Sequence, residues 1–175
     1  MADICTIIDA QTIRFERLLP ASIERAWDYL TKPERLRGWL AESEMDLRAG
    51  GHVELCFDVG EVPDRAKAGA VIRGVVTRIE PPRALAYTWT DTRAVPDSEV
   101  TFELDAPAQD VLLVLTHRRL PPPVLPNCAA GWHTHLGILL KRLRGEEPEP
   151  FLPVYERLLP MYTYLATSAE ADAAR

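Results

Sequence analysis

Histidine is the residue type in this chain with the most chemistry to offer near neutral pH. His117 ends an apolar alternation that begins at Val111, so we expect it on an inward face, bonded either to a ligand oxygen or to a backbone carbonyl. His133 and His135 are two residues apart on an expected helix, which separates them by about 200° around the axis. A helical metal pair is spaced i and i+4, so we predict no metal site.

Other catalytic constellations are weak in this sequence. There is no GxSxG motif, and the serines fall at expected caps, loops or the tail. Cys5, Cys56 and Cys128 are far apart and form no CxxC, which argues against a disulfide framework and a zinc knuckle. The carboxylates between Glu42 and Asp58 stand at strand ends, where such groups are usually solvated. We assign no catalytic residue, no metal and no cofactor, and we interpret the protein as more a binder than an enzyme.

The composition describes one globular domain with no general attraction for polyanions. The chain has 175 residues, of which 47% are hydrophobic and 26% charged. A net charge of −6 disfavours phosphate backbones and anionic lipid, so we predict no nucleic-acid partner. The N-terminus lacks a signal-peptide pattern, and the longest aliphatic run, residues 111–115, is too short to span a bilayer. We expect a cytoplasmic protein without membrane insertion.

The spacing of apolar residues predicts the elements that must position these side chains. A strand over residues 12–18 precedes a helix with Ser22 as its N-cap and a second, short helix with Pro33 in its first turn. A long late helix is expected to begin at Asn127 as its cap and to end at Gly145. Between them, five strands are expected at residues 52–58, 70–80, 84–90, 99–105 and 110–117.

Two early helices, a run of strands and one long late helix predict an α+β fold, in which a curved antiparallel sheet wraps around the long helix. A sheet and a helix do not interdigitate everywhere, so the expected binding site is an apolar cavity between them. The expected cavity lining consists of Trp27, Trp39, Tyr87, Trp89, Phe102, Leu113, His117, Trp132 and Leu136. The alternative is that these side chains only fill the core.

Four stretches of the chain form a recognisable set: WDYLTKPERLRGWL (residues 27–40), the pair Gly50-Gly51, RIEPPRALAYTW (residues 78–89), and the stretch from Thr116-His117 to Gly145. Together they resemble the activator-of-heat-shock-ATPase-homologue branch of the SRPBCC superfamily, also called START or Bet v 1-like. The resemblance implies the helix-grip (Bet v 1-like) fold, with two short helices after the first strand. Members of this superfamily share a cavity and differ in its lining.

The chain is expected to divide into a helix-grip domain, residues 1–146, and a C-terminal extension, residues 147–175. The extension reads as an acidic, proline-rich linker, a short helix over Pro153 to Ala166 kinked at Pro160, and a frayed tail. The strand at residues 110–117 is apolar on both faces, so its outer face needs a cover. The extension or a second subunit of a homodimer could supply that cover.

The first functional hypothesis is that the protein binds a small apolar molecule, lipid-like or polyketide-like, between sheet and long helix. Two alternatives stay open. The family's name implies a chaperone-ATPase regulator of the stress response in contact with a chaperone, although that activity belongs to proteins with a further N-terminal domain, for which the residues before Ile13 leave no room. A cyclase- or hydrolase-like enzyme would need a carboxylate or Tyr87 within hydrogen-bond reach of His117.

Overall fold

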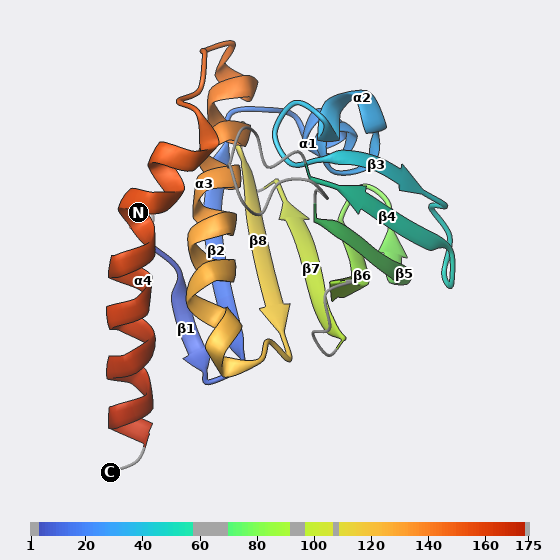
Figure 1. The fold of residues 1–175 in the computed structure, drawn as a ribbon. Coiled ribbons are helices and arrows are strands. Elements are labelled where there is room, and N and C mark those ends of the chain that lie inside the picture. Colours follow the sequence, from blue (N-terminus) through green and yellow to red (C-terminus); the bar gives the residue numbers. More distant parts are fainter. Residues whose placement is uncertain (1–3, 58–69, 92–96, 107–108, 174–175) are drawn as a thin grey trace.

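A computed structural model describes residues 4–57, 70–91, 97–106 and 109–173 of the chain. The predicted helix-grip architecture is confirmed, because a curved antiparallel sheet carries the long helix α3 across one face (Figure 1). The elements, in chain order, are β1 (Thr6–Asp9), β2 (Thr12–Leu19), α1 (Ile23–Thr31), α2 (Pro33–Leu36), β3 (Glu42–Met45), β4 (His52–Cys56), β5 (Val71–Glu80), β6 (Ala84–Asp91), β7 (Ser98–Asp105), β8 (Val111–Arg118), the 3-10 turn η1 (Pro122–Val124), α3 (Leu125–Arg144) and α4 (Phe151–Ala173).

The sheet has the strand order β1-β2-β8-β7-β6-β5-β4-β3. Its register places Ile13 opposite His117, His117 opposite Val100, and Val100 opposite Tyr87. These four residues therefore lie in one row on the face that α3 covers, and all four are buried. The five strands expected between residues 52 and 117 are present, and their observed ends lie within one or two residues of the predicted ones; residue 58, the predicted end of the first strand, lies outside the described residues. The short strands β1 and β3, TIID and ESEM, were not predicted, because they hold too few alternating apolar residues.

The short helices form where local capping chemistry predicts them. The Ser22 side chain accepts a hydrogen bond from the Arg25 amide at 3.3 Å and so caps α1. Pro33 opens α2, where its missing N–H has no helical partner to lose. The indole N–H of Trp39 then donates to the Tyr29 carbonyl at 2.8 Å. This bond fixes the segment after α2 to α1 and holds Trp39 at the edge of the sheet's concave side.

Helix α3 ends as expected but begins earlier. Gly145 closes it in the left-handed conformation, with φ of 73°, as predicted. The prediction that Asn127 caps its start is wrong, because η1 leads directly into the helix and Val124 occupies the cap position. The Oδ1 atom of Asn127 instead accepts a hydrogen bond from the Tyr155 hydroxyl at 3.0 Å. Asn127 thus joins α3 to α4.

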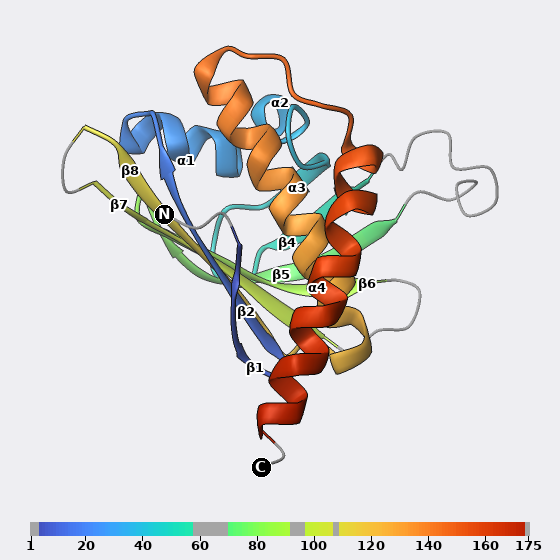
Figure 2. The same cartoon turned by 90° about the vertical axis from the view of Figure 1, so that its left-hand side faces the viewer.

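Helix α4 is longer than the short helix expected in the extension, and it reaches Ala173 where a frayed tail was expected from residue 170. It runs antiparallel to α3 on the same side of the sheet (Figures 1 and 2) and also contacts β1. Tyr162 is fully buried in this contact. Packing of one helix face supplies the stabilisation that propensity alone does not provide. The extension therefore lies against α3 and β1, and not over the outer face of β8. Among the described residues, no helix is both long and apolar enough to cross a membrane.

Candidate functional site

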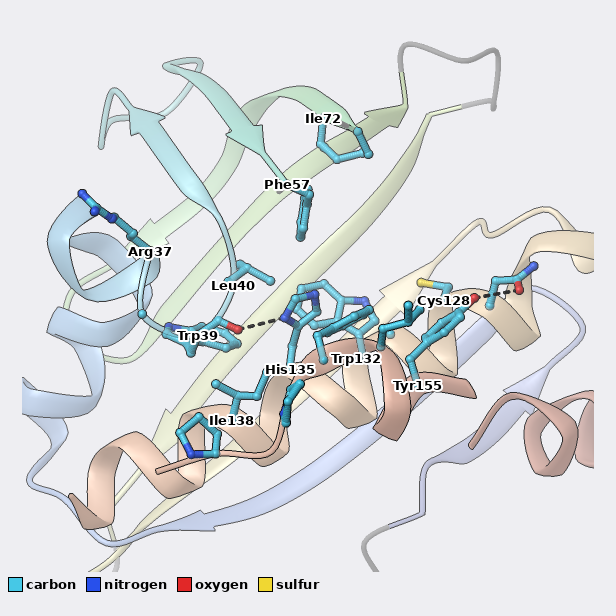
Figure 3. A pocket seen from close by; sticks show the side chains of 18 of the residues that line it. Arg37, Trp39, Leu40, Phe57, Ile72, Cys128, Trp132, His135, Ile138 and Tyr155 are labelled. Atoms are coloured by element: carbon cyan, nitrogen blue, oxygen red, sulfur yellow. Dashed lines mark hydrogen bonds between the residues drawn. The ribbon is translucent and has the colours of Figure 1, made fainter. Parts of the chain in front are cut away.

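A pocket of about 810 Å³ lies between α3, the β4–β6 part of the sheet and the beginning of α4 (Figure 3). This volume falls in the range of pockets that hold small organic ligands. Aromatic side chains form much of its wall. The principal lining side chains are Trp39, Leu40, Phe57, Ile72, Trp89, Cys128, Trp132, His135, Ile138, Phe151 and Tyr155.

The structure brings three of the nine predicted lining residues to this pocket, namely Trp39, Trp89 and Trp132. The others are not among the residues that line it: Tyr87, Phe102, Leu113, His117 and Leu136 are buried, and Trp27 is half-buried against the core. The space directly beneath α3 is packed, since the Phe102 ring lies 5.8 Å from that of Trp132. The pocket therefore lies to one side of α3, toward β4 and β5. Ligand contact by any of the nine residues stays a prediction.

Sequence reasoning missed four lining residues that carry aromatic rings, and for two of them a signal was present. Phe57 continues the alternation of Val53 and Leu55 along β4. His135 follows Trp132 by three residues on α3, so the two side chains share a face. Phe151 and Tyr155 come from α4, whose position beside the pocket depends on tertiary packing that no local pattern reveals.

His117 is held in a buried hydrogen-bond network. The Trp132 indole N–H donates to His117 Nδ1 at 3.0 Å, and the Cys128 thiol lies 3.4 Å from the same nitrogen. An indole nitrogen only donates, so Nδ1 is the unprotonated nitrogen and the proton is on Nε2. Nε2 therefore donates to the Ser98 hydroxyl at 2.7 Å, and the Ser98 hydroxyl in turn donates to the Trp89 carbonyl at 3.2 Å.

This proton arrangement stabilises structure and does not activate a nucleophile. Burial, helped by the charge of Arg119, lowers the pKa of His117 to about 3, so the imidazole is neutral. Burial also raises the pKa of the Cys128 thiol to about 12. Ser98 faces the protonated nitrogen of the imidazole, which cannot take its proton. The cluster instead fixes the orientation of Trp132 at the pocket wall.

The hydrolase-like alternative required a carboxylate or Tyr87 beside His117. In the part of the chain that the structure describes, the side chains bonded to His117 are Ser98, Cys128 and Trp132. That requirement is therefore not met among these residues.

His135 is a second histidine with a fixed tautomer, and it lines the pocket itself. Its Nδ1 lies 2.8 Å from the Trp39 carbonyl oxygen, which can only accept, so Nδ1 carries the proton (Figure 3). Burial lowers the pKa of His135 to about 4, although the bond to Trp39 acts in the opposite direction. The ring lies 4.7 Å from that of Phe151 and 5.7 Å from that of Phe57. His133 instead bonds Tyr162, so the two histidines face different neighbours, as their spacing predicts.

The charged residues around the pocket are paired with one another. Arg37 lies 3.0 Å from a carboxylate oxygen of Glu42, and Arg142 lies 3.1 Å from one of Glu147. Arg142 also donates to the Gly38 carbonyl at 3.2 Å. The fourth charged lining residue, Glu149, lies 3.6 Å from Arg157. Within the described ranges, no three histidine, cysteine or acidic side chains gather as a metal site would require.

Comparison of the sequence with known protein families identifies one match. The family model described as Activator of Hsp90 ATPase homolog 1-like protein matches residues 20–144. No protein of curated function matches the sequence. The pocket walls contributed by residues 147–155 lie beyond the matched range.

Solved structures extend the similarity over most of the chain. The protein encoded by gene BPP1335 of Bordetella parapertussis is 38% identical, with a TM-score of 0.76 over 90% of this chain and 87% of that one. CalU16 of Micromonospora echinospora is 25% identical, with a TM-score of 0.71 over 94% of this chain and 95% of that one. EF2215 of Enterococcus faecalis, a protein of unknown function, is 25% identical, with a TM-score of 0.70 over 91% and 87%.

Proposed function

Because the chain belongs to the Activator of Hsp90 ATPase homolog 1-like family and carries an apolar pocket of about 810 Å³, we propose that it binds a small, largely apolar molecule there. In this proposal the helix-grip domain, residues 1–146, provides most of the walls. The extension, residues 147–175, closes one side with the linker and the first turn of α4. A ligand of lipid-like or polyketide-like character suits such a site.

The observation that carries the proposal is the convergence of aromatic side chains from separate parts of the chain. Trp39 follows α2, Phe57 follows β4, Trp132 belongs to α3, and Phe151 begins α4. Aromatic walls bury large areas and favour flat partners through stacked and edge-to-face contacts. The rim charges are paired, so a neutral ligand leaves none of those ion pairs broken.

The test uses a glycine of α3 to fill the pocket from one wall. Gly131 lines the pocket, and a Cβ atom built on it meets no atom within 4 Å. A Cβ atom at this position is therefore free of clashes, and the rest of the Gly131→Leu side chain should extend into the pocket while the substitution favours the helix. We expect it to weaken binding of N-phenyl-1-naphthylamine, measured by fluorescence titration, by about tenfold or more, equivalent to about 1.4 kcal/mol.

Gly137→Leu is the matched control. Gly137 belongs to the same helix, also has open space at its Cβ position, and is not among the lining residues. This variant should bind the probe as the unmodified protein does. Equal affinity in all three proteins, or no stoichiometric binding by the unmodified protein, would contradict the proposal.

The compartment and the protein partners are separate proposals. Cys5, Cys56 and Cys128 are free thiols, which suits the reducing cytoplasm. Homodimer formation is tested by sedimentation of the purified protein. Contact with a chaperone is tested by whether the protein raises the ATP turnover of an Hsp90-type ATPase.

A further inference from the structure

We infer that His135 Nε2 is a hydrogen-bond acceptor facing the pocket, and that the ligand is a neutral aromatic molecule bearing a hydroxyl group that donates to it. This inference rests on the proposed function and adds the chemical class of the ligand. The argument depends on the tautomer of His135, on its surroundings and on the charges of the pocket.

The tautomer follows from one backbone contact. The Trp39 carbonyl accepts the Nδ1 proton at 2.8 Å, and a neutral imidazole holds only one proton. Nε2 therefore presents a lone pair. The low pKa of His135, about 4, keeps the ring in this neutral form near pH 7. Among the hydrogen bonds of the described residues, the bond to Trp39 is the one that His135 makes.

The surroundings of Nε2 are aromatic. The His135 ring lies on the pocket wall between the Trp39 carbonyl and Phe57 (Figure 3). The ring of Phe57 lies 5.7 Å away and that of Phe151 lies 4.7 Å away. A flat ring that enters between these side chains gains apolar contact, and a hydroxyl on its edge can meet the lone pair.

The charged groups of the wall and the lone pair of His135 disfavour an acidic ligand. A carboxylate would face the lone pair of Nε2 without a proton to share. The two arginines of the wall, Arg37 and Arg142, already pair with Glu42 and Glu147. A carboxylate would have to share a guanidinium with the glutamate already bound to it and would meet like-charge repulsion, whereas a neutral hydroxyl needs no charge partner.

The experiment compares 2-naphthol with 2-methoxynaphthalene, which share a ring system but differ in the O–H donor. Binding is measured by isothermal titration calorimetry on the full chain. In His135→Phe, we expect the dissociation constant of 2-naphthol, divided by that of 2-methoxynaphthalene, to rise by about three- to tenfold. Loss of one hydrogen bond to 2-naphthol predicts a change of this size. Affinity for 2-methoxynaphthalene should stay within about twofold, because Phe preserves the apolar wall. Comparing the ratio between the two proteins cancels the difference in hydrophobicity between the probes.

His52→Phe is the matched control, since His52 is exposed on β4 and bonds Glu44 outside the pocket. It should leave the ratio unchanged. A second test uses nuclear magnetic resonance on the unmodified protein. The ¹⁵N resonance of His135 Nε2 should shift on addition of 2-naphthol and not of 2-methoxynaphthalene.

The outcomes separate the two levels of the proposal. If both probes bind but the ratio is the same in His135→Phe, or Nε2 responds equally to both, the hydroxyl inference is wrong while the binding function stands. If the unmodified protein binds N-phenyl-1-naphthylamine but neither naphthalene probe, the hydroxyl inference is wrong and the binding function stands. If it binds none of the three, the proposed function is overturned and the inference with it.

Discussion

The hydroxyl of Tyr162 and Nδ1 of His133 share a hydrogen bond of 2.7 Å, which joins α4 to α3. The same hydroxyl accepts the Cys5 amide proton at 3.3 Å, so one buried atom connects both helices to the segment before β1. This contact holds α4 in the position from which its first turn reaches the pocket.

Tyr162→Phe should lower the free energy of unfolding by about 1–3 kcal/mol, because the buried polar groups of Cys5 and His133 each lose a partner. Urea unfolding followed by circular dichroism measures the change. Tyr164→Phe is the control, since Tyr164 is 72% exposed on the same helix. A Tyr162 variant as stable as this control would show that the bond does not anchor α4.

Gly145, which closes α3, and Gly137, which lies within it, should respond to alanine with opposite signs. Gly145 adopts φ of 73°, where a Cβ atom is strained, so Gly145→Ala should destabilise the protein by about 1 kcal/mol. Gly137 lies inside the helix with open space at its Cβ position, and Gly137→Ala should stabilise by about 0.5–1 kcal/mol. Thermal unfolding of both variants measures the difference. A shift of the same sign would contradict the assigned cap.

The sheet and the caps could be predicted because their determinants are local. The alternation of Leu85, Tyr87 and Trp89 defines β6, and Ser22 caps α1 from its own sequence neighbourhood. The prediction that Asn127 caps α3 failed because it, too, considered only local partners. A polar residue near a helix start was assigned a local partner, but Tyr155 on α4 provides the actual one.

The pocket could be predicted only in part. Trp89 and Trp132 follow from a strand face and a helix face, and Trp39 follows from its place just after the second short helix. Whether a side chain lies in packed core or beside open space could not be predicted in this way, because that depends on how side chains from distant elements fill a volume. Phe102 and Tyr87 share the expected face yet are buried against one another, with ring centroids 6.0 Å apart.

The buried neutral His117 should make stability fall in acid. Its pKa is about 3 in the folded protein and near 6.5 when unfolded, so the unfolded state binds more protons below pH 6.5. The stabilisation is complete above that pH and decreases, by about 1.4 kcal/mol per pH unit, as pH falls from 6.5 toward 3. In His117→Phe, the loss of stability between pH 7 and pH 5 should be smaller by about 2 kcal/mol. Urea unfolding at both pH values checks this, with the exposed His52→Phe as control; an unchanged pH dependence would contradict a neutral His117.

Phe151 tests whether the extension is part of the binding site or only packs against it. Its ring lies 4.7 Å from that of His135 and 5.6 Å from that of Tyr155, at the point where α4 begins. Phe151→Ala removes one aromatic wall, so N-phenyl-1-naphthylamine should bind about three- to tenfold more weakly. The bonds of Tyr155 and Tyr162 should keep α4 in place, and the circular dichroism spectrum should not change.

Tyr164→Ala, on an exposed part of the same helix, should bind the probe normally. If Phe151→Ala also bound normally while α4 stayed docked, the aromatic ring that the extension supplies at residue 151 would stabilise the fold without contributing to recognition.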